Sequence, residues 1–171
     1  CYMRDVQLIL NMVRNDVLGE ISHCEIGYQH DTRYVTIDNK GNLLWRAHER
    51  SLNNNGNRYP THAIGPASQW IDINRGNKFE YLVSMSSRSQ GRNHYAAQKV
   101  GKDHPTTKLP FQLGDVNTTL IMTNRGETIA LYYDPQTPRP VDFIWRIQGT
   151  NGIYSGTLNK IHIDGRSPNH Q

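Results

Sequence analysis

Residues 120–133 read LIMTNRGETIALYY, and this stretch decides the fold class that the sequence predicts. A strand-like apolar stretch lies on each side of residues 124–126, Asn-Arg-Gly. Asn tolerates turn conformations and Gly accepts a positive φ, so three such residues suit a short β-hairpin connection. The same punctuation recurs as Asn-Lys-Gly at 39–41 and Asn-Arg-Gly at 74–76. We therefore expect three hairpin tips and an all-β protein.

Alternation of period two, which is typical of half-buried strands, recurs along much of the chain. The expected strands are residues 24–30, 34–38, 42–46, 69–73, 78–86, 118–123, 128–134, 142–148 and 157–164. Many short strands separated by turn signals are typical of an antiparallel sandwich or barrel. The sequence therefore predicts a mainly β fold, a single antiparallel β-sandwich of about 8–10 short strands with an N-terminal amphipathic helix.

Residues 3–18 form the one convincing helical pattern, with a wide apolar stripe and Gly19 as its stop. Such a helix either docks on a core or inserts into a membrane surface. We expect one domain over residues 1–171, with the helix in 1–19, the sandwich in 24–164 and a flexible tail at 165–171. Residues 47–68 and 86–115 contain many loop-forming residues, and they are interpreted as two long loops.

The 171 residues are 36% hydrophobic and carry a net charge of +4, with no apolar run long enough to span a bilayer. No signal peptide with a hydrophobic centre is visible. The two cysteines, Cys1 and Cys24, do not define a disulfide framework, so their pairing stays open.

The net charge is concentrated in one basic window, where five bases face the single acid Asp103. Its bases are Arg88, Arg92, Lys99, Lys102 and Lys108. A local basic stretch indicates either an anionic partner, nucleic acid included, or a solvated loop.

Eight histidines invite a search for catalytic or metal chemistry. No metal-ligand spacing occurs, and the signatures of serine hydrolases, P-loops and dinucleotide-binding folds are missing, so we expect neither a metal nor a cofactor. A small metal-independent ribonuclease remains an alternative. It would act through His94 or His104, with cations such as Arg92 and Lys99 for the phosphate and Glu80 as a further acid/base group.

Aromatic residues surround the proline-rich segment at 134–142 and form the candidate ligand site. Its members are Tyr132, Tyr133, Arg139 and Trp145. An aromatic rim beside a cation would suit a sugar, a choline headgroup or an interfacial anchor. Alternation places Trp145 in the core instead, which leaves Tyr132 and Arg139 as the members expected to be exposed.

The order of these features resembles the actinoporin-like cytolysins. The matching features are the N-terminal helix, the hairpin at 120–133, the proline- and aromatic-bearing loop, and the strand around Trp145. Residues 34–83 are similarly comparable with aegerolysin-like proteins. The resemblance implies a secreted, membrane-binding toxin that recognises a lipid headgroup, inserts its helix and assembles into a homo-oligomer. A lectin-like module that binds a glycan on the same scaffold is the alternative, and either would work by binding rather than by turnover.

Overall fold

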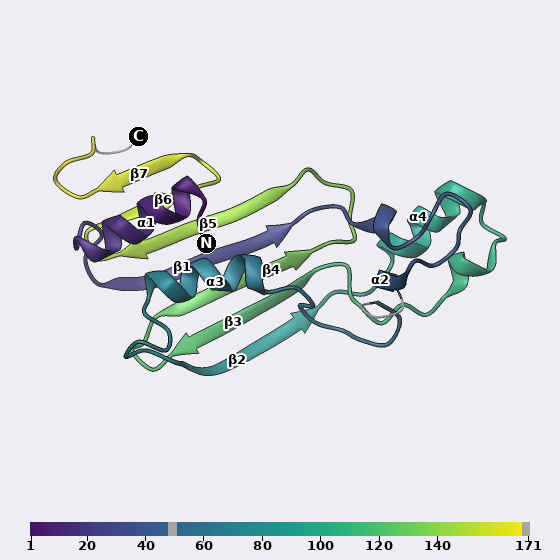
Figure 1. The fold of residues 1–171 in the computed structure, drawn as a ribbon, viewed down its shortest axis with the longest axis horizontal. Helices are drawn as coiled ribbons and strands as arrows, with labels where there is room; N and C mark the ends of the chain where they lie inside the picture. Colours follow the sequence, from purple (N-terminus) through teal and green to yellow (C-terminus); the bar gives the residue numbers. More distant parts are fainter. Residues whose placement is uncertain (48–50, 169–171) are drawn as a thin grey trace.

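The computed structural model describes residues 1–47 and 51–168. Within these residues the strands form one seven-stranded sheet in the order β2-β3-β4-β1-β5-β6-β7 (Figure 1). The strands are β1 (Ile21–Gln29), β2 (Phe79–Ser86), β3 (Asn117–Thr123), β4 (Thr128–Asp134), β5 (Asp142–Gly149), β6 (Gly152–Ser155) and β7 (Lys160–Ile163).

The predicted antiparallel sandwich is wrong, because the sheet is mixed and helices cover it. Strands β1 and β4 run parallel, whereas the other neighbouring strands pair antiparallel. Helices α1 (Arg4–Arg14) and α3 (Thr61–Trp70) lie across one face of the sheet (Figure 1). Alternation shows that a strand has an apolar face, but it does not show whether a helix or a second sheet covers that face.

Helix α1 lies inside the segment where a helix was expected, yet its apolar stripe is already used by the core. Val6 and Ile9 are fully buried, and Trp70 of α3 donates a hydrogen bond from Nε1 to the Val6 carbonyl at 3.1 Å. Because these contacts hold α1 against α3 and against the sheet, its apolar face is not available for insertion into a membrane.

Two helices occupy the segments that were expected to be long loops. In α3 the stripe Ala63, Ala67 and Trp70 is buried, although Pro66 lies inside the helix. Burial of this stripe outweighs the backbone N–H that proline lacks. In the basic window, α4 (Gly91–Val100) ends at Gly101, where φ is +86°.

Shorter helical turns replace several expected strands. Residues 34–38 overlap the 3-10 turn η1 (Arg33–Val35), and residues 42–46 overlap the short helix α2 (Trp45–Ala47). Residues 69–73 include the end of α3, and η3 (Pro105–Lys108) follows α4. Short apolar runs do not distinguish strands from helical turns, and this ambiguity produced the errors.

The three Asn-(Lys/Arg)-Gly sites are all turns, but only one of them joins two paired strands. Residues 124–126 connect β3 to β4, as predicted, with Gly126 at φ +98°. Residues 39–41 close a single antiparallel bridge, and residues 74–76 lead from α3 into β2. Gly41 and Gly76 also have positive φ, so the local turn chemistry was correct where the long-range pairing was not.

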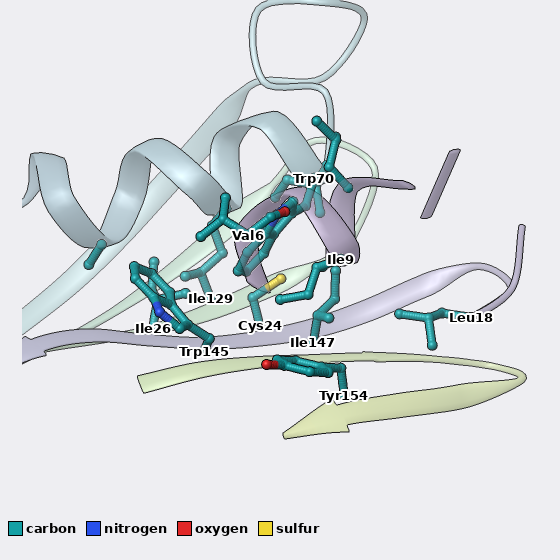
Figure 2. Close-up of a cluster of buried hydrophobic side chains, with 14 of the residues drawn as sticks. Val6, Ile9, Leu18, Cys24, Ile26, Trp70, Ile129, Trp145, Ile147 and Tyr154 are labelled. Carbon is teal, nitrogen blue, oxygen red and sulfur yellow. The ribbon is translucent and has the colours of Figure 1, made fainter. Parts of the chain in front are cut away.

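The main core lies between the sheet and the two helices (Figure 2). Trp70 and Trp145 meet edge to face at 6.0 Å between ring centroids, next to Ile26 and Ile129. Cys24 is buried here, and burial raises the pKa of its thiol to about 12. Cys1 is exposed and both cysteines are free, so the two do not pair.

The opposite face of the sheet carries apolar side chains that remain exposed in this chain. Tyr81, Val83 and Met85 of β2 and Leu120 of β3 are each more than half exposed.

Among the residues that the structure covers, no helix has the length and apolarity to cross a bilayer. Of the tail expected at 165–171, residues 169–171 lie outside the described range.

Candidate functional site

A pocket of about 160 Å³ opens where the parallel strands β1 and β4 reach their carboxyl ends. This end of the sheet faces α2 and α4 (Figure 1). Ten residues line the pocket: Tyr28, His30, Thr32, Thr36, Arg46, Tyr59, His62, Arg92, Tyr133 and Pro135. Clefts at the carboxyl ends of parallel strands are common ligand sites in sheet proteins, which makes this pocket the candidate functional site.

The pairing of strands β1, β4 and β5 places three aromatic residues side by side at the pocket. Tyr28 on β1 is paired with Tyr133 on β4 and with Phe143 on β5, so three aromatic residues form a row on the helix-covered face. The ring centroids of Tyr28 and Phe143 are 5.2 Å apart. Beyond the row, the Thr32 hydroxyl donates to the Pro135 carbonyl at 2.8 Å and ties the two strand ends together.

Four residues form an aromatic cluster that we define as Tyr28, His30, Tyr59 and His62. Tyr28 lies at its centre, with its ring centroid 4.7 Å from those of His30 and His62 and 6.1 Å from that of Tyr59. Tyr59 and His62 meet edge to face, also at 4.7 Å. The cluster therefore places two imidazoles and two phenols beside one small space.

Helix α3 positions half of the aromatic cluster. Tyr59 precedes the helix, Pro60 is its N-cap and His62 lies in its first turn. The other end of α3 is anchored in the core by Trp70, which is only 2% exposed. The core packing of α3 thus determines where the His62 ring lies.

Burial changes the proton affinity of two members of the cluster. It raises the pKa of Tyr28, and the nearby Tyr59 adds to this effect. Burial also lowers the pKa of His30, a shift that Asp31 partly offsets and that Arg46 and His62 reinforce. His30 is therefore held in its neutral form, which can both accept and donate a proton.

The predicted aromatic site is divided between different environments. Tyr133 lines the pocket, whereas Tyr132 points to the opposite face of the sheet. Trp145 is buried in the main core, 3% exposed. Arg139 lies in ion pairs, with Asp134 at 2.8 Å and Asp142 at 3.3 Å. The four residues do not form one rim, because consecutive residues of a strand point to opposite faces.

The basic window is also divided. Arg92 is buried and lines the pocket. Arg88, Lys102 and Lys108 are exposed and do not line it. Lys99 on α4 contacts the ring of Tyr95, with Nζ 5.3 Å from its centroid. The ribonuclease candidates His94 and His104 lie outside this pocket, and His94 is exposed.

Sequence reasoning missed the cluster residues Tyr28, His30, Tyr59 and His62, together with Arg46. The available signal was the helical stripe of residues 63, 67 and 70, which marks α3 and gives residues 59–62 a place at a helix start. Once that segment is assigned to a loop, nothing in the sequence connects it to the end of β1.

Comparisons with known proteins bear directly on this site. The family model described as Glycosyl hydrolase 109, C-terminal domain, matches residues 2–171. A glycosyl hydrolase family 109 protein from Stenotrophomonas maltophilia is 40% identical, over 100% of this chain and 41% of its own length. An α-N-acetylgalactosaminidase from Tannerella forsythia is 38% identical, over 100% of this chain and 40% of its own. The chain thus spans about two fifths of the length of these relatives.

Solved structures share the fold at much lower identity. Levoglucosan dehydrogenase in complex with NADH has a TM-score of 0.63 at 16% identity, covering 94% of this chain and 40% of that one. An inositol dehydrogenase homolog from Azotobacter vinelandii has a TM-score of 0.60 at 15% identity, covering 95% and 39%. This likeness shows that the chain shares the fold of the matched part of these two proteins.

These matches overturn the resemblance to actinoporin-like and aegerolysin-like cytolysins. The expected functions of a membrane-binding toxin, a lectin-like module and a ribonuclease are wrong as well. A hairpin followed by a proline-rich loop and a Trp-containing strand is a local pattern that unrelated sheets share, so it does not specify a family.

Proposed function

The chain belongs to the glycosyl hydrolase 109 family, and we propose that it forms the sugar-binding pocket of an α-N-acetylgalactosaminidase-like glycosidase. The observation that carries this proposal is the aromatic cluster around a pocket at the ends of β1 and β4. The α-N-acetylgalactosaminidase of Tannerella forsythia, which is 38% identical, supports the choice of sugar.

Aromatic rings suit the recognition of a sugar ring. The apolar C–H face of a pyranose packs on an aromatic face, while the hydroxyl groups of the sugar reach polar side chains at the rim. Here Tyr28 and Tyr59 supply rings, and Thr32, Thr36 and Arg46 supply polar groups in the same lining.

The imidazole and phenol groups of this pocket are its candidates for proton transfer. Glycosidases that use two carboxylates need an Asp or Glu on each side of the bond, and neither type occurs among the lining residues that the structure describes. We infer that His62 and Tyr59 are the acid/base candidates of this chain, since their rings are in contact at the pocket. The sequence contains no dinucleotide fingerprint, so no residue of this chain is assigned to a nicotinamide cofactor.

The test is hydrolysis of 4-nitrophenyl N-acetyl-α-D-galactosaminide by the natural protein that contains this chain. The assay is run with and without added NAD⁺, because levoglucosan dehydrogenase, whose fold the chain shares, is found with NADH. We expect His62→Ala and Tyr59→Phe to lower kcat/KM by about 10²- to 10⁴-fold, the usual contribution of a general acid or base.

His94→Ala is the matched control, since it removes an exposed histidine of α4 that does not line the pocket. The control should keep wild-type activity. Full activity in both His62→Ala and Tyr59→Phe, with folding unchanged by circular dichroism, would rule out this pocket as the site.

A further inference from the structure

Arg92 is a buried cation that forms no ion pair with any residue in the described ranges 1–47 and 51–168. It is 2% exposed, yet its Nε and Nη1 atoms have no hydrogen-bond partner in the described residues. Its guanidinium lies 5.8 Å from the centroid of the Phe111 ring. Arginines are almost never this buried without a partner, because removing an unpaired charge from water costs several kcal/mol.

Asp115 and Asp134, two carboxylates in this region, are already engaged by other groups. Asp115 accepts hydrogen bonds from the backbone N–H groups of Gln90 and Gly91, both at 2.9 Å, at the start of α4. Asp134 accepts from Arg139 at 2.8 Å and from the Thr137 hydroxyl at 2.6 Å. These two carboxylates thus hold the helix start and the strand end, and although Asp115 raises the pKa of Arg92, neither forms an ion pair with it.

A second arginine lines the same pocket. The Arg46 guanidinium stacks 5.1 Å from the ring centroid of Trp45, and it forms no ion pair with any of the described residues. Two cations therefore line a pocket whose other described lining residues include no carboxylate. Burial lowers the pKa of Arg92 to about 10, so its side chain still carries a positive charge at neutral pH.

We propose that the substrate of this pocket carries a sulfate ester on its amino sugar, and that Arg92 and Arg46 bind this oxyanion. This inference rests on the proposed function, and it specifies that the glycoside bound in this pocket is acidic rather than neutral. A guanidinium matches such groups well, since its planar N–H donors align with two oxygens at once. A bound oxyanion would also supply the acceptors that Arg92 lacks within the protein.

Isothermal titration calorimetry on the natural protein tests the proposal. The probes are N-acetylgalactosamine, its 6-sulfate and 4-sulfate, and inorganic sulfate. At least one sulfated sugar should bind at least about tenfold more tightly than the neutral sugar, and Arg92→Met should remove that difference.

Arg92→Lys should keep part of the preference, because it keeps the charge but loses the planar fork. Arg88→Met, which removes an exposed arginine of the same window, should change nothing.

Thermal unfolding separates lost binding from lost folding. Without ligand, Arg92→Met should melt a few degrees above the wild type, because it removes a buried charge. Equal binding of neutral and sulfated sugars by the wild type, or a preference that survives in Arg92→Met, would overturn the proposal. In that case neutral-sugar binding that depends on His62 would leave the proposed function standing. If no sugar binds, even if inorganic sulfate does, both proposals fail.

Discussion

At the scale of single residues, position relative to the sheet determines what each side chain can do. Tyr132 and Tyr133 are adjacent in sequence, yet only Tyr133 lies on the face that leads into the pocket. Trp145 is on this same helix-covered face, and there it joins the core rather than a binding surface. The candidate ligand residues were chosen by type, and type alone does not distinguish these positions.

Protonation of His30 is expected to make the stability of the protein depend on pH. Burial lowers the pKa of His30 in the folded state below that of an unfolded histidine, about 6.5. The unfolded chain therefore binds this proton more readily, so the stability contributed by neutral His30 is present above about pH 6.5 and is lost as the pH falls below it. We expect the urea midpoint to drop between pH 7.5 and 5.5, and to drop less in His30→Gln.

His94→Gln serves as the reference for this comparison, because His94 is exposed on α4. Its pH dependence should match that of the wild type. An identical drop in His30→Gln and in the wild type would show that protonation of His30 does not oppose folding.

At the scale of elements, α3 connects the core to the pocket. Its buried stripe, Ala63, Ala67 and Trp70, packs on the sheet, and its first turn carries His62. The Trp70 indole also fixes α1 through its hydrogen bond to Val6. A helix that carries a site residue at one end is positioned by whatever anchors the other end, so this packing serves both stability and function.

We therefore expect Trp70→Ala to lower the free energy of unfolding by about 3–5 kcal/mol, as for other buried aromatic truncations. Trp70→Phe should cost less, about 1–3 kcal/mol, since it keeps most of the ring but leaves the Val6 carbonyl without its donor. Urea unfolding measures both values. Leu158→Ala, at an exposed position, should stay within about 0.5 kcal/mol. A loss below about 1 kcal/mol in Trp70→Ala would contradict this role for α3.

At the scale of the whole molecule, most of the buried apolar residues in the described ranges fall into two clusters of unequal size. The main core joins α1, α3 and the central strands, whereas the second cluster contains Ile37, Ala96 and Phe111 below α4. The pocket lies between these two regions, with β1 and α3 on one side and Arg92 of α4 on the other. Regions with few buried contacts open more readily than the core of the same protein.

Hydrogen exchange followed by mass spectrometry tests this hierarchy. Amides of β1 (Ile21–Gln29) should exchange at least about tenfold more slowly than those of α4 (Gly91–Val100), because α4 rests on the smaller cluster. Equal protection of the two segments would instead indicate that the whole chain opens as one unit.

How much the sequence revealed depended on the range of the interactions involved. The hairpin at 124–126 and the strands around it follow from turn chemistry and alternation, which act over a few residues. The parallel pairing of β1 with β4 joins segments about 100 residues apart, and no local sequence pattern predicts it. The sandwich was predicted from many short strands separated by turn signals, and this pattern does not show which strands pair or in which direction.

By itself, the sequence determined the positions of most strands, the apolar stripe of α1 and the three glycine turns, because each depends on contacts within one turn or one strand. Only the tertiary structure decided that helices cover the sheet and that α3 brings His62 to Tyr28. It also placed Arg92 of the basic window, read from the sequence as a loop, inside the pocket beside Tyr133. The physical reason is that a pocket is made by packing distant segments together, and packing depends on the faces that the whole chain leaves to be buried.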